Sequence, residues 1–258
     1  MNRRVVAKMH GARNDFVVID TRESPVADAA ALAVRLCDRH AGIGADGLLL
    51  VGGPSSGADV AMRVINPDGS EAEMCGNGIR CVARFLDERG EGGEHDVATS
   101  AGVIRTSVVE RGESYRVRVD MGIPRVVEGT PPIGDAVVVD TGNPHIVIFR
   151  DSLSDIDLSL LGSTLQRHSA FENGVNVHVV TIHDQTHLAM RHYERGAGLT
   201  MACGTGAVAA VAAARFLGRV KPNVDVRVPG GDLRVEIDAS GRAFMTGPAV
   251  HVFDTTVE

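Results

Sequence analysis

The feature that most constrains the fold is a short motif that occurs twice, about half a chain apart. Cys-Gly-Asn-Gly at 75–78 and Cys-Gly-Thr-Gly at 203–206 begin 128 residues apart in a chain of 258 residues. Each copy precedes a predicted helix, over about 77–89 and about 205–217, and both helices contain Arg-Phe-Leu near their ends. We therefore expect two similar halves, each with a Cys-Gly loop at the start of a helix.

Hydrophobic periodicity predicts strands and helices in both halves. Strands are expected within 5–20, 48–51, 59–66, 96–121, 136–140, 146–149, 175–182, 186–194 and 224–252. Two further helices are expected, one to about residue 39 with Ser24 as capping hydroxyl and Pro25 in its first turn, and one from about residue 158. The segment 122–134, rich in proline and glycine, is the candidate linker.

Composition excludes several classes of function. The net charge is −7 and no basic stripe is present, so we expect no nucleic-acid partner. No apolar run approaches the ~18–20 residues of a membrane span, and no apolar secretory segment is visible, which predicts a cytoplasmic protein without membrane contact. Lys8 and Lys221 are the only lysines and lack a cofactor-cradling context, which argues against a pyridoxal phosphate enzyme.

The four cysteines divide into two pairs. None stands in a C-x-x-C pattern, so a structural zinc site is not expected. Cys37 and Cys81 lie within predicted helices, where a buried, inert thiol is the usual state. The histidines at 178, 183, 187 and 192 fall on a predicted hairpin, which we expect to scatter them over different faces, so no metal site is expected there.

Cys75 and Cys203 are placed differently, because each stands at a predicted helix N-terminus. The unpaired N–H groups and the positive end of the helix dipole there favour a thiolate, which predicts a lowered pKa. The same N–H groups bind carboxylates. Two such loops facing each other across a cleft would place two thiols on opposite sides of one small carboxylate and invert its stereocentre without cofactor or metal.

At this level of detail the sequence resembles the diaminopimelate epimerase family. The resemblance rests on MHGARNDF at 9–16, NPDGSEAEMCGNGIR at 66–80, GNPH at 142–145, VNV at 175–177, YERGAG at 193–198 and ACGTG at 202–206. It implies an α+β fold of two structurally similar domains, each a mixed, largely antiparallel sheet around a central helix, with the active site in the cleft between them. We expect domains over 1–121, completed by a strand at 247–258, and over 122–246.

The resemblance also implies an activity, which is cofactor-independent epimerisation of LL-2,6-diaminopimelate to the meso form by a homodimer. Cys75 and Cys203 would be the catalytic acid/base pair, with His145 and Glu194 tuning their pKa values. The implied substrate-binding residues are Asn14, Asn66, Gly76, Asn77, Asn143, Asn176, Glu194, Arg195, Gly204 and Thr205. Leu199 and Gly47 depart from the family pattern, where many members carry glutamate and some carry glutamine.

Two other functions fit part of this pattern. One is a racemase of proline, hydroxyproline or histidine on the same fold, although Arg195 and the asparagines have no purpose for a substrate without a second polar amino acid centre. The other is a thiol redox switch or peroxide sensor, because reactive thiols at helix ends would serve that role as well.

Overall fold

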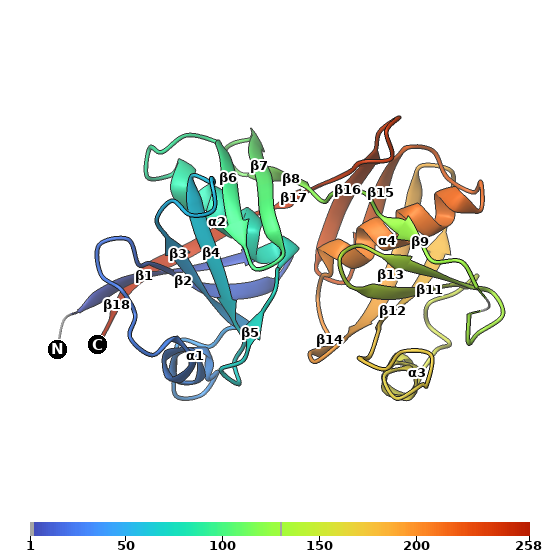
Figure 1. The fold of residues 1–258 in the computed structure, drawn as a ribbon, viewed down its shortest axis with the longest axis horizontal. Helices are drawn as coiled ribbons and strands as arrows, with labels where there is room; N and C mark the ends of the chain where they lie inside the picture. The colour runs from blue at the N-terminus through green and yellow to red at the C-terminus, as the bar shows by residue number, and fades with distance from the viewer. Residues whose placement is uncertain (1–2, 130) are drawn as a thin grey trace. The chain divides into compact units, whose positions relative to one another are not determined.

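The computed structural model describes residues 3–129 and 131–258, which divide into two compact units (Figure 1). Unit 1 contains the chain up to Val119 together with Gly247–Glu258, and unit 2 contains Asp120–Thr246. The chain therefore leaves unit 1 after Val119 and returns to it for its last strand. No helix in the described part of the chain is long and apolar enough to cross a membrane.

Unit 1 is a curved mixed sheet with two helices. Its neighbouring strands run in the order β18, β1, β2, β3, β4, β6, β7, β8, and only the pairs β2–β3 and β4–β6 are parallel. The bounds are β1 Arg4–Gly11, β2 Asn14–Asp20, α1 Ala29–Cys37, β3 Gly47–Gly52, β4 Val60–Ile65, β5 Glu71–Ala72, α2 Gly76–Asp87, β6 Glu94–Thr99, β7 Gly102–Glu110, β8 Arg116–Asp120 and β18 Val250–Val257.

Unit 2 repeats this arrangement. Its strands run in the order β9, β10, β11, β12, β13, β15, β16, β17, and here the parallel pairs are β11–β12 and β13–β15. The bounds are β9 Arg125–Val126, β10 Ala136–Asp140, β11 Pro144–Phe149, α3 Leu158–Leu165, β12 Asn176–Ile182, β13 His187–Glu194, β14 Gly198–Leu199, α4 Gly204–Phe216, β15 Asn223–Val228, β16 Gly231–Ile237 and β17 Ala243–Pro248. The expected pair of similar, largely antiparallel halves is confirmed.

A central helix fills the concave side of each sheet (Figure 1). α2 contacts β1, β2, β3, β4, β6, β7 and β18, and α4 contacts β9, β10, β11, β12 and β16. Every residue of α4 from Gly206 to Ala214 is buried, and this run consists of alanine, valine and glycine. Such small side chains allow the surrounding strands to approach the helix on all sides, whereas a helix covered on one side needs only one apolar stripe.

Two predicted boundaries are wrong. α1 begins four residues beyond Pro25, because the carboxylate of Asp28 caps it by accepting from the N–H of Ala31 at 2.9 Å. The hydroxyl of Ser24 instead accepts from Arg4 at 3.0 Å. The predicted linker 122–134 contains β9, which pairs with β10, so part of this segment belongs to the sheet of unit 2.

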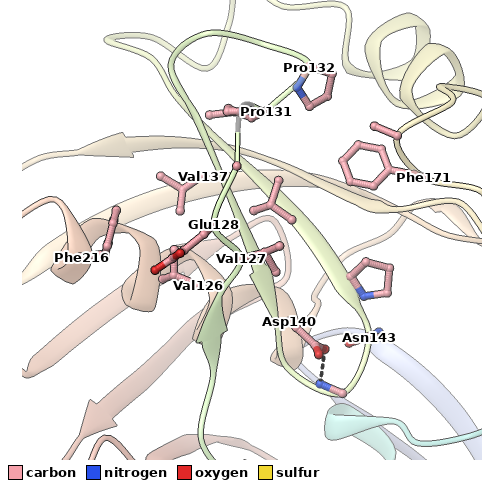
Figure 2. Close-up of a pocket in the computed structure, with 16 residues that line it drawn as sticks. Val126, Val127, Glu128, Pro131, Pro132, Val137, Asp140, Asn143, Phe171 and Phe216 are labelled. Atoms are coloured by element: carbon pink, nitrogen blue, oxygen red, sulfur yellow. Dashed lines mark hydrogen bonds between the residues drawn. The ribbon is translucent and has the colours of Figure 1, made fainter.

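Unit 2 also carries a solvent-open pocket of about 760 Å³ beside β9 and β10 (Figure 2). Its lining is mostly apolar and includes Val126, Val137, Phe171 and Phe216, with Asn143 at its margin. Cys203 does not line it. The pocket therefore does not include the thiol at the N-terminus of α4, and we assign no substrate to it.

Candidate active site

Cys75 and Cys203 occupy equivalent positions, because each is the N-cap residue of the central helix of its unit. Both have extended backbone, with φ −137° and ψ 109° at Cys75 and φ −129° and ψ 108° at Cys203. Each sulfur accepts a hydrogen bond from the N–H three residues ahead, at 3.4 Å from Gly78 and 3.3 Å from Gly206. The sulfur thus takes the place of the oxygen that usually caps a helix, and both thiols lie at the positive end of a helix dipole.

The hairpin between β1 and β2 brings Asn14 to the first of these cysteines. Its two central residues, Ala12 and Arg13, both have positive φ, 51° and 64°, as a tight type I′ turn requires. Gly11 allows the hairpin to lie directly on α2, because a Cβ at this position would stand 2.8 Å from the carbonyl oxygen of Asn77. As a result, Asn14 Oδ1 accepts from Asn77 Nδ2 at 3.1 Å and from the thiol of Cys75 at 3.8 Å.

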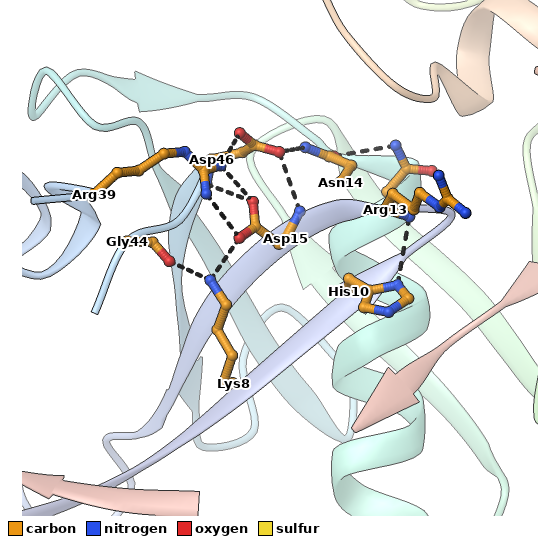
Figure 3. A network of polar contacts seen from close by, with 9 residues as sticks. Lys8, His10, Arg13, Asn14, Asp15, Arg39, Gly44 and Asp46 are labelled. Carbon is orange, nitrogen blue, oxygen red and sulfur yellow. Dashed lines mark hydrogen bonds and ion pairs between the residues drawn. The ribbon is translucent and has the colours of Figure 1, made fainter. Parts of the chain in front are cut away.

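A network of charged side chains fixes the orientation of the Asn14 amide (Figure 3). Asp46 accepts from Asn14 Nδ2 at 2.8 Å, so the amide oxygen must point toward Cys75. Arg39 donates to both Asp46 and Asp15 at 2.7 Å, and Lys8 forms an ion pair with Asp15 at 2.5 Å. Burial raises the pKa of Asp15, but the hydrogen bonds from Arg39 and Lys8 outweigh this and hold the pKa well below its usual range.

Behind Cys75 lies a fully buried arginine that sequence reasoning did not assign to the site. Arg80 donates to the carbonyl oxygens of Gly76 and Pro248, both at 3.0 Å, and to Asn77 Oδ1 at 2.9 Å. Burial lowers its pKa to about 10, so the guanidinium remains charged at neutral pH. Arg80 therefore holds the first turn of α2 in place and brings a positive charge close to Cys75. The sequence feature that could have identified Arg80 as a site residue is its position at the end of the motif 66–80.

The surroundings of Cys203 contradict the expected lowering of its pKa. Burial, followed by the negative charge of Glu194, raises the pKa well above its usual range, while hydrogen bonds from Thr205 and the Gly206 N–H oppose this more weakly. The hydroxyl of Thr200 in turn donates to the Glu194 carboxylate. The helix dipole is therefore outweighed here, and Cys203 is held as the neutral thiol. Sequence alone missed this because it does not show how deeply the thiol is buried.

Three histidines, which we call the histidine row, lie side by side in unit 2, and the central one, His178, packs against the first turn of α4. They are His145 on β11, His178 on β12 and His192 on β13, and all are at most 1% exposed. His145 Nδ1 lies 2.8 Å from His178 Nε2, and His145 Nε2 lies 2.8 Å from Asn143 Oδ1. His178 and His192 are direct cross-strand partners. The expectation that the hairpin separates its histidines is wrong for this pair, because the register places them on one face.

The histidine row predicts a specific pH dependence of stability. Burial lowers the pKa of His145 to about 3 and of His192 to about 4, and lowers that of His178 as well. The unfolded chain, with histidine pKa values of about 6.5, takes up protons that the folded chain excludes, so stability is full above pH 6.5 and falls as the pH drops toward 4. We expect a loss of about 2 kcal/mol per buried histidine between pH 7 and pH 5.

Urea unfolding at pH 5, 6 and 7 measures this effect. His192→Phe is expected to flatten the pH dependence of the free energy of unfolding by about 2 kcal/mol over this range. His40→Phe, at an exposed position, is the control for loss of an imidazole. An unchanged slope in His192→Phe would show that this ring is protonated in the folded protein.

The predicted distal binding residues are held mainly by backbone contacts. Asn176 Oδ1 accepts from the N–H of Arg195 and Asn176 Nδ2 donates to the carbonyl oxygen of Pro144, both at 3.0 Å. Asn66 closes its turn through Ser70 Oγ at 2.9 Å. The exposed guanidinium of Arg195 donates at 3.4 Å to the Asn173 carbonyl and has no ion-pair partner among the residues described. Its positive charge is therefore available to an anionic ligand.

The two departures from the family pattern lie at different kinds of position. Gly47 begins β3 and is buried, and a Cβ there would stand 3.2 Å from the carbonyl oxygen of Ile65. Leu199 lies on β14 opposite Tyr193 and is 52% exposed. A larger side chain at position 47 would thus require the neighbouring strand to shift, whereas position 199 has room for other side chains.

Cys37 and Cys81 are buried and, unlike Cys75 and Cys203, do not cap a helix N-terminus. Burial raises the pKa of Cys37 to about 11 and that of Cys81 to about 12. Within the described residues, no group of three or more histidine, cysteine, aspartate or glutamate side chains is arranged to hold a metal ion. The reactive candidates are therefore the two thiols at the helix N-termini.

Comparison with known proteins identifies the family of the chain. The family model described as diaminopimelate epimerase matches residues 6–127 and 137–252, which include both cysteine caps. The chain belongs to the diaminopimelate epimerase family. A diaminopimelate epimerase of Desulfitobacterium hafniense is 41% identical, with 96% of each chain covered. One of Pelotomaculum thermopropionicum is 45% identical, covering 95% of this chain and 96% of its own.

Solved structures share the fold of this diaminopimelate epimerase family member at much lower identity. A phenazine biosynthesis protein of the PhzF family from Bacillus anthracis has a TM-score of 0.75 and 18% identity, with all of both chains covered. A hydroxyproline epimerase from Agrobacterium vitis, with bound trans-4-hydroxy-L-proline, has a TM-score of 0.73 and 18% identity over 100% of this chain and 91% of its own. At this identity the likeness concerns the fold alone.

Proposed function

We propose that this chain catalyses the cofactor-independent epimerisation of LL-2,6-diaminopimelate to the meso form. The observation that carries the proposal is the equivalent capping position of Cys75 and Cys203 in two units of the same topology. A reaction that removes a proton from one face of a carbon and returns one to the other needs two groups of one chemical type. A duplicated fold with one thiol at each central helix supplies such a pair.

In the proposed reaction, the thiolate of one cysteine takes the α-proton, and the electrons of the C–H bond move into the substrate carboxylate. The thiol of the other cysteine donates its proton to the opposite face of the carbon, which inverts the centre. Burial and Glu194 favour the neutral thiol at Cys203, so we assign Cys203 as the proton donor for this direction of the reaction. The thiol of Cys75, which donates to Asn14 Oδ1, must first lose its proton to solvent to act as the base. In the reverse direction the roles of the two cysteines exchange.

The negative charge that develops on the substrate carboxylate needs preorganised donors. We assign this role to the helix N-termini at Gly76 and Asn77 and at Gly204 and Thr205, whose N–H groups and dipoles favour an anion. Arg195, with Asn14, Asn66, Asn143 and Asn176, would bind the distal amino acid centre. His145 and Glu194 would tune the cysteine pair. The unpaired charge of Arg195 supports this, because guanidinium groups bind carboxylates through two parallel hydrogen bonds.

The proposal is tested by measuring turnover of LL-diaminopimelate beside L-proline, trans-4-hydroxy-L-proline and L-histidine. Under reducing conditions in deuterated water, we expect inversion and α-deuterium incorporation with diaminopimelate alone. Turnover of one of the other amino acids without diaminopimelate would establish the alternative racemase. Neither binding nor turnover of diaminopimelate would favour a thiol switch.

Asp46 offers a test of how Asn14 serves this reaction. Asp46→Asn removes the carboxylate that orients the Asn14 amide, so the amide can turn its NH₂ group toward Cys75. We expect kcat/KM to fall by up to about 100-fold, as misplacement of a group in an active site can do. Asp59→Asn, at an acid that accepts from the N–H of Asp96, is the matched control. Equal activity in both variants would contradict the assigned role.

Oxidation tests whether the two thiols meet in solution. We expect air oxidation to join Cys75 to Cys203 and abolish activity, and a reductant to restore it. Peptide mass spectrometry without reduction identifies the bond, and Cys37→Ala is the control that leaves this pair intact. Irreversible loss of activity without such a bond would count against the proposed pairing.

We further propose that the enzyme is a homodimer in the cytoplasm, as the resemblance to its family implies. Analytical ultracentrifugation of the purified protein measures the assembly state. A monomer at catalytic concentrations with full activity would contradict the dimer.

A further inference from the structure

The hydrogen bonds that link Asn143, His145 and His178 form a buried chain with a definable direction. Asn143 Oδ1 receives two contacts, from His145 Nε2 at 2.8 Å and from Thr141 Oγ1 at 3.1 Å. An amide oxygen only accepts, so His145 must carry its proton on Nε2. Its Nδ1 is then a lone pair and accepts from His178 Nε2, 2.8 Å away. His178 therefore carries its proton on Nε2 as well.

The opposite direction of these hydrogen bonds, in which His145 donates to His178, is disfavoured by the surroundings of His178. It would place a proton on His178 Nδ1, which is buried and has no hydrogen-bond partner among the described residues. An unpaired buried nitrogen is costly both as a donor and as an acceptor, so its surroundings decide between the two forms. This nitrogen also faces the first turn of α4, since a Cβ on Gly206 would stand 2.7 Å from it. The N–H groups and positive dipole of a helix N-terminus favour a lone pair there over a second donor.

We propose that His178 is a positioning residue that acts through His145 to fix the Asn143 amide with its oxygen inward and its NH₂ group toward the ligand. In this orientation Asn143 can only donate to a ligand at that point. It therefore recognises a carboxylate oxygen and rejects an ammonium group. This inference rests on the proposed function, in which the substrate brings a second carboxylate and a second ammonium group to unit 2.

His178 has no role in the proposed proton transfer, and its neighbour His192 provides a matched comparison. Both are fully buried on the same face of adjacent strands, but neither ring nitrogen of His192 has a hydrogen-bond partner among the residues described. Replacing either ring with phenylalanine keeps an aromatic group at the position. Only His178→Phe removes the donor to His145.

Nitrogen NMR of histidine-labelled protein measures the tautomers of His145 and His178, and so the direction of these hydrogen bonds, without an activity assay. In the wild type we expect both His145 and His178 as Nε2–H tautomers. In His178→Phe we expect His145 to lose this single form, and in His192→Phe to keep it. A wild-type His145 protonated on Nδ1, or an unchanged His145 in a folded His178→Phe protein, would overturn the proposal.

Kinetics test the consequence for the ligand. We expect His178→Phe to raise KM for diaminopimelate about tenfold with a smaller change in kcat, His178→Gln to restore part of the loss through its amide N–H, and His192→Phe to leave KM unchanged. Asn143→Asp keeps the acceptor for His145 but removes the NH₂ group, so its KM should rise further. Equal KM values in the folded His178→Phe and His192→Phe proteins would overturn the recognition step. If the wild type has no activity on diaminopimelate, the proposed function fails, and with it the carboxylate recognition. The histidine tautomers measured by NMR still test the direction of the hydrogen bonds that link Asn143, His145 and His178.

Discussion

Cys75→Ala and Cys203→Ala are each expected to lower kcat for epimerisation of LL-diaminopimelate by about 10²- to 10⁴-fold, the range typical for loss of a general acid or base. In a two-base reaction neither cysteine can replace the other, because each serves one face of the carbon. Both variants should therefore fail in both directions, from the LL and from the meso isomer. The measurement is isomer composition over time, with α-deuterium incorporation followed by mass spectrometry.

Cys37→Ala is the matched control for these variants. Cys37 is 3% exposed and packs with Ala33, Leu36 and Leu48 in the core between α1 and the sheet. Its loss should affect stability and leave the rate unchanged. Wild-type turnover by either Cys75→Ala or Cys203→Ala would exclude the two-thiol mechanism.

Gly206→Ala is expected to lower the free energy of unfolding by about 1–3 kcal/mol, as overpacking a core does. The added Cβ would stand 2.2 Å from Cε1 of His178, whose ring is fully buried. Either the ring or the first turn of α4 must then move. Because the N–H of Gly206 donates a hydrogen bond to the sulfur of Cys203, we expect activity to fall as well. Chemical denaturation followed by circular dichroism measures the stability change.

The duplicated fold supplies the control for this substitution. Gly78 occupies the equivalent position in α2, where a Cβ would stand 2.9 Å from a methyl group of Leu49. The end of a leucine side chain can rotate away, so Gly78→Ala should cost less than Gly206→Ala. Adding His178→Ala to Gly206→Ala makes room for the methyl group, and the double variant should lose less stability than the sum of the single losses. Equal losses at both glycines, or strict additivity, would contradict this account.

Local signals in the sequence predicted the elements that carry the thiols. The Cys-Gly loops predicted helix starts at residues 77 and 205, and the helices begin at Gly76 and Gly204. The duplicated motif predicted two similar halves, and the matching order and direction of strand pairing confirms this. These features were accessible because capping and periodicity depend on residues close together in the chain.

Features that depend on tertiary packing could not be predicted in this way. The pKa of Cys203 is raised because burial and Glu194 oppose the helix dipole, and burial is not a local property of the sequence. His178 and His192 share a face because of the register of β12 against β13, which the position of the turn alone does not specify. Asp46 orients Asn14 across 32 residues of sequence. In each case the partner comes from a different strand or loop.

The return of the chain to unit 1 has a consequence for the order in which the protein is completed during synthesis. The residues of unit 2 are continuous in sequence, whereas unit 1 lacks β18, the strand that pairs along β1 from Arg4 to His10, until residues 250–257 have been synthesised. The second unit can therefore close its sheet before the first. Until then the nascent chain carries β1 with one open edge, and the carbonyl of Pro248 that accepts from Arg80 is also missing. The Cys75 helix thus receives this support only after unit 2 has been synthesised.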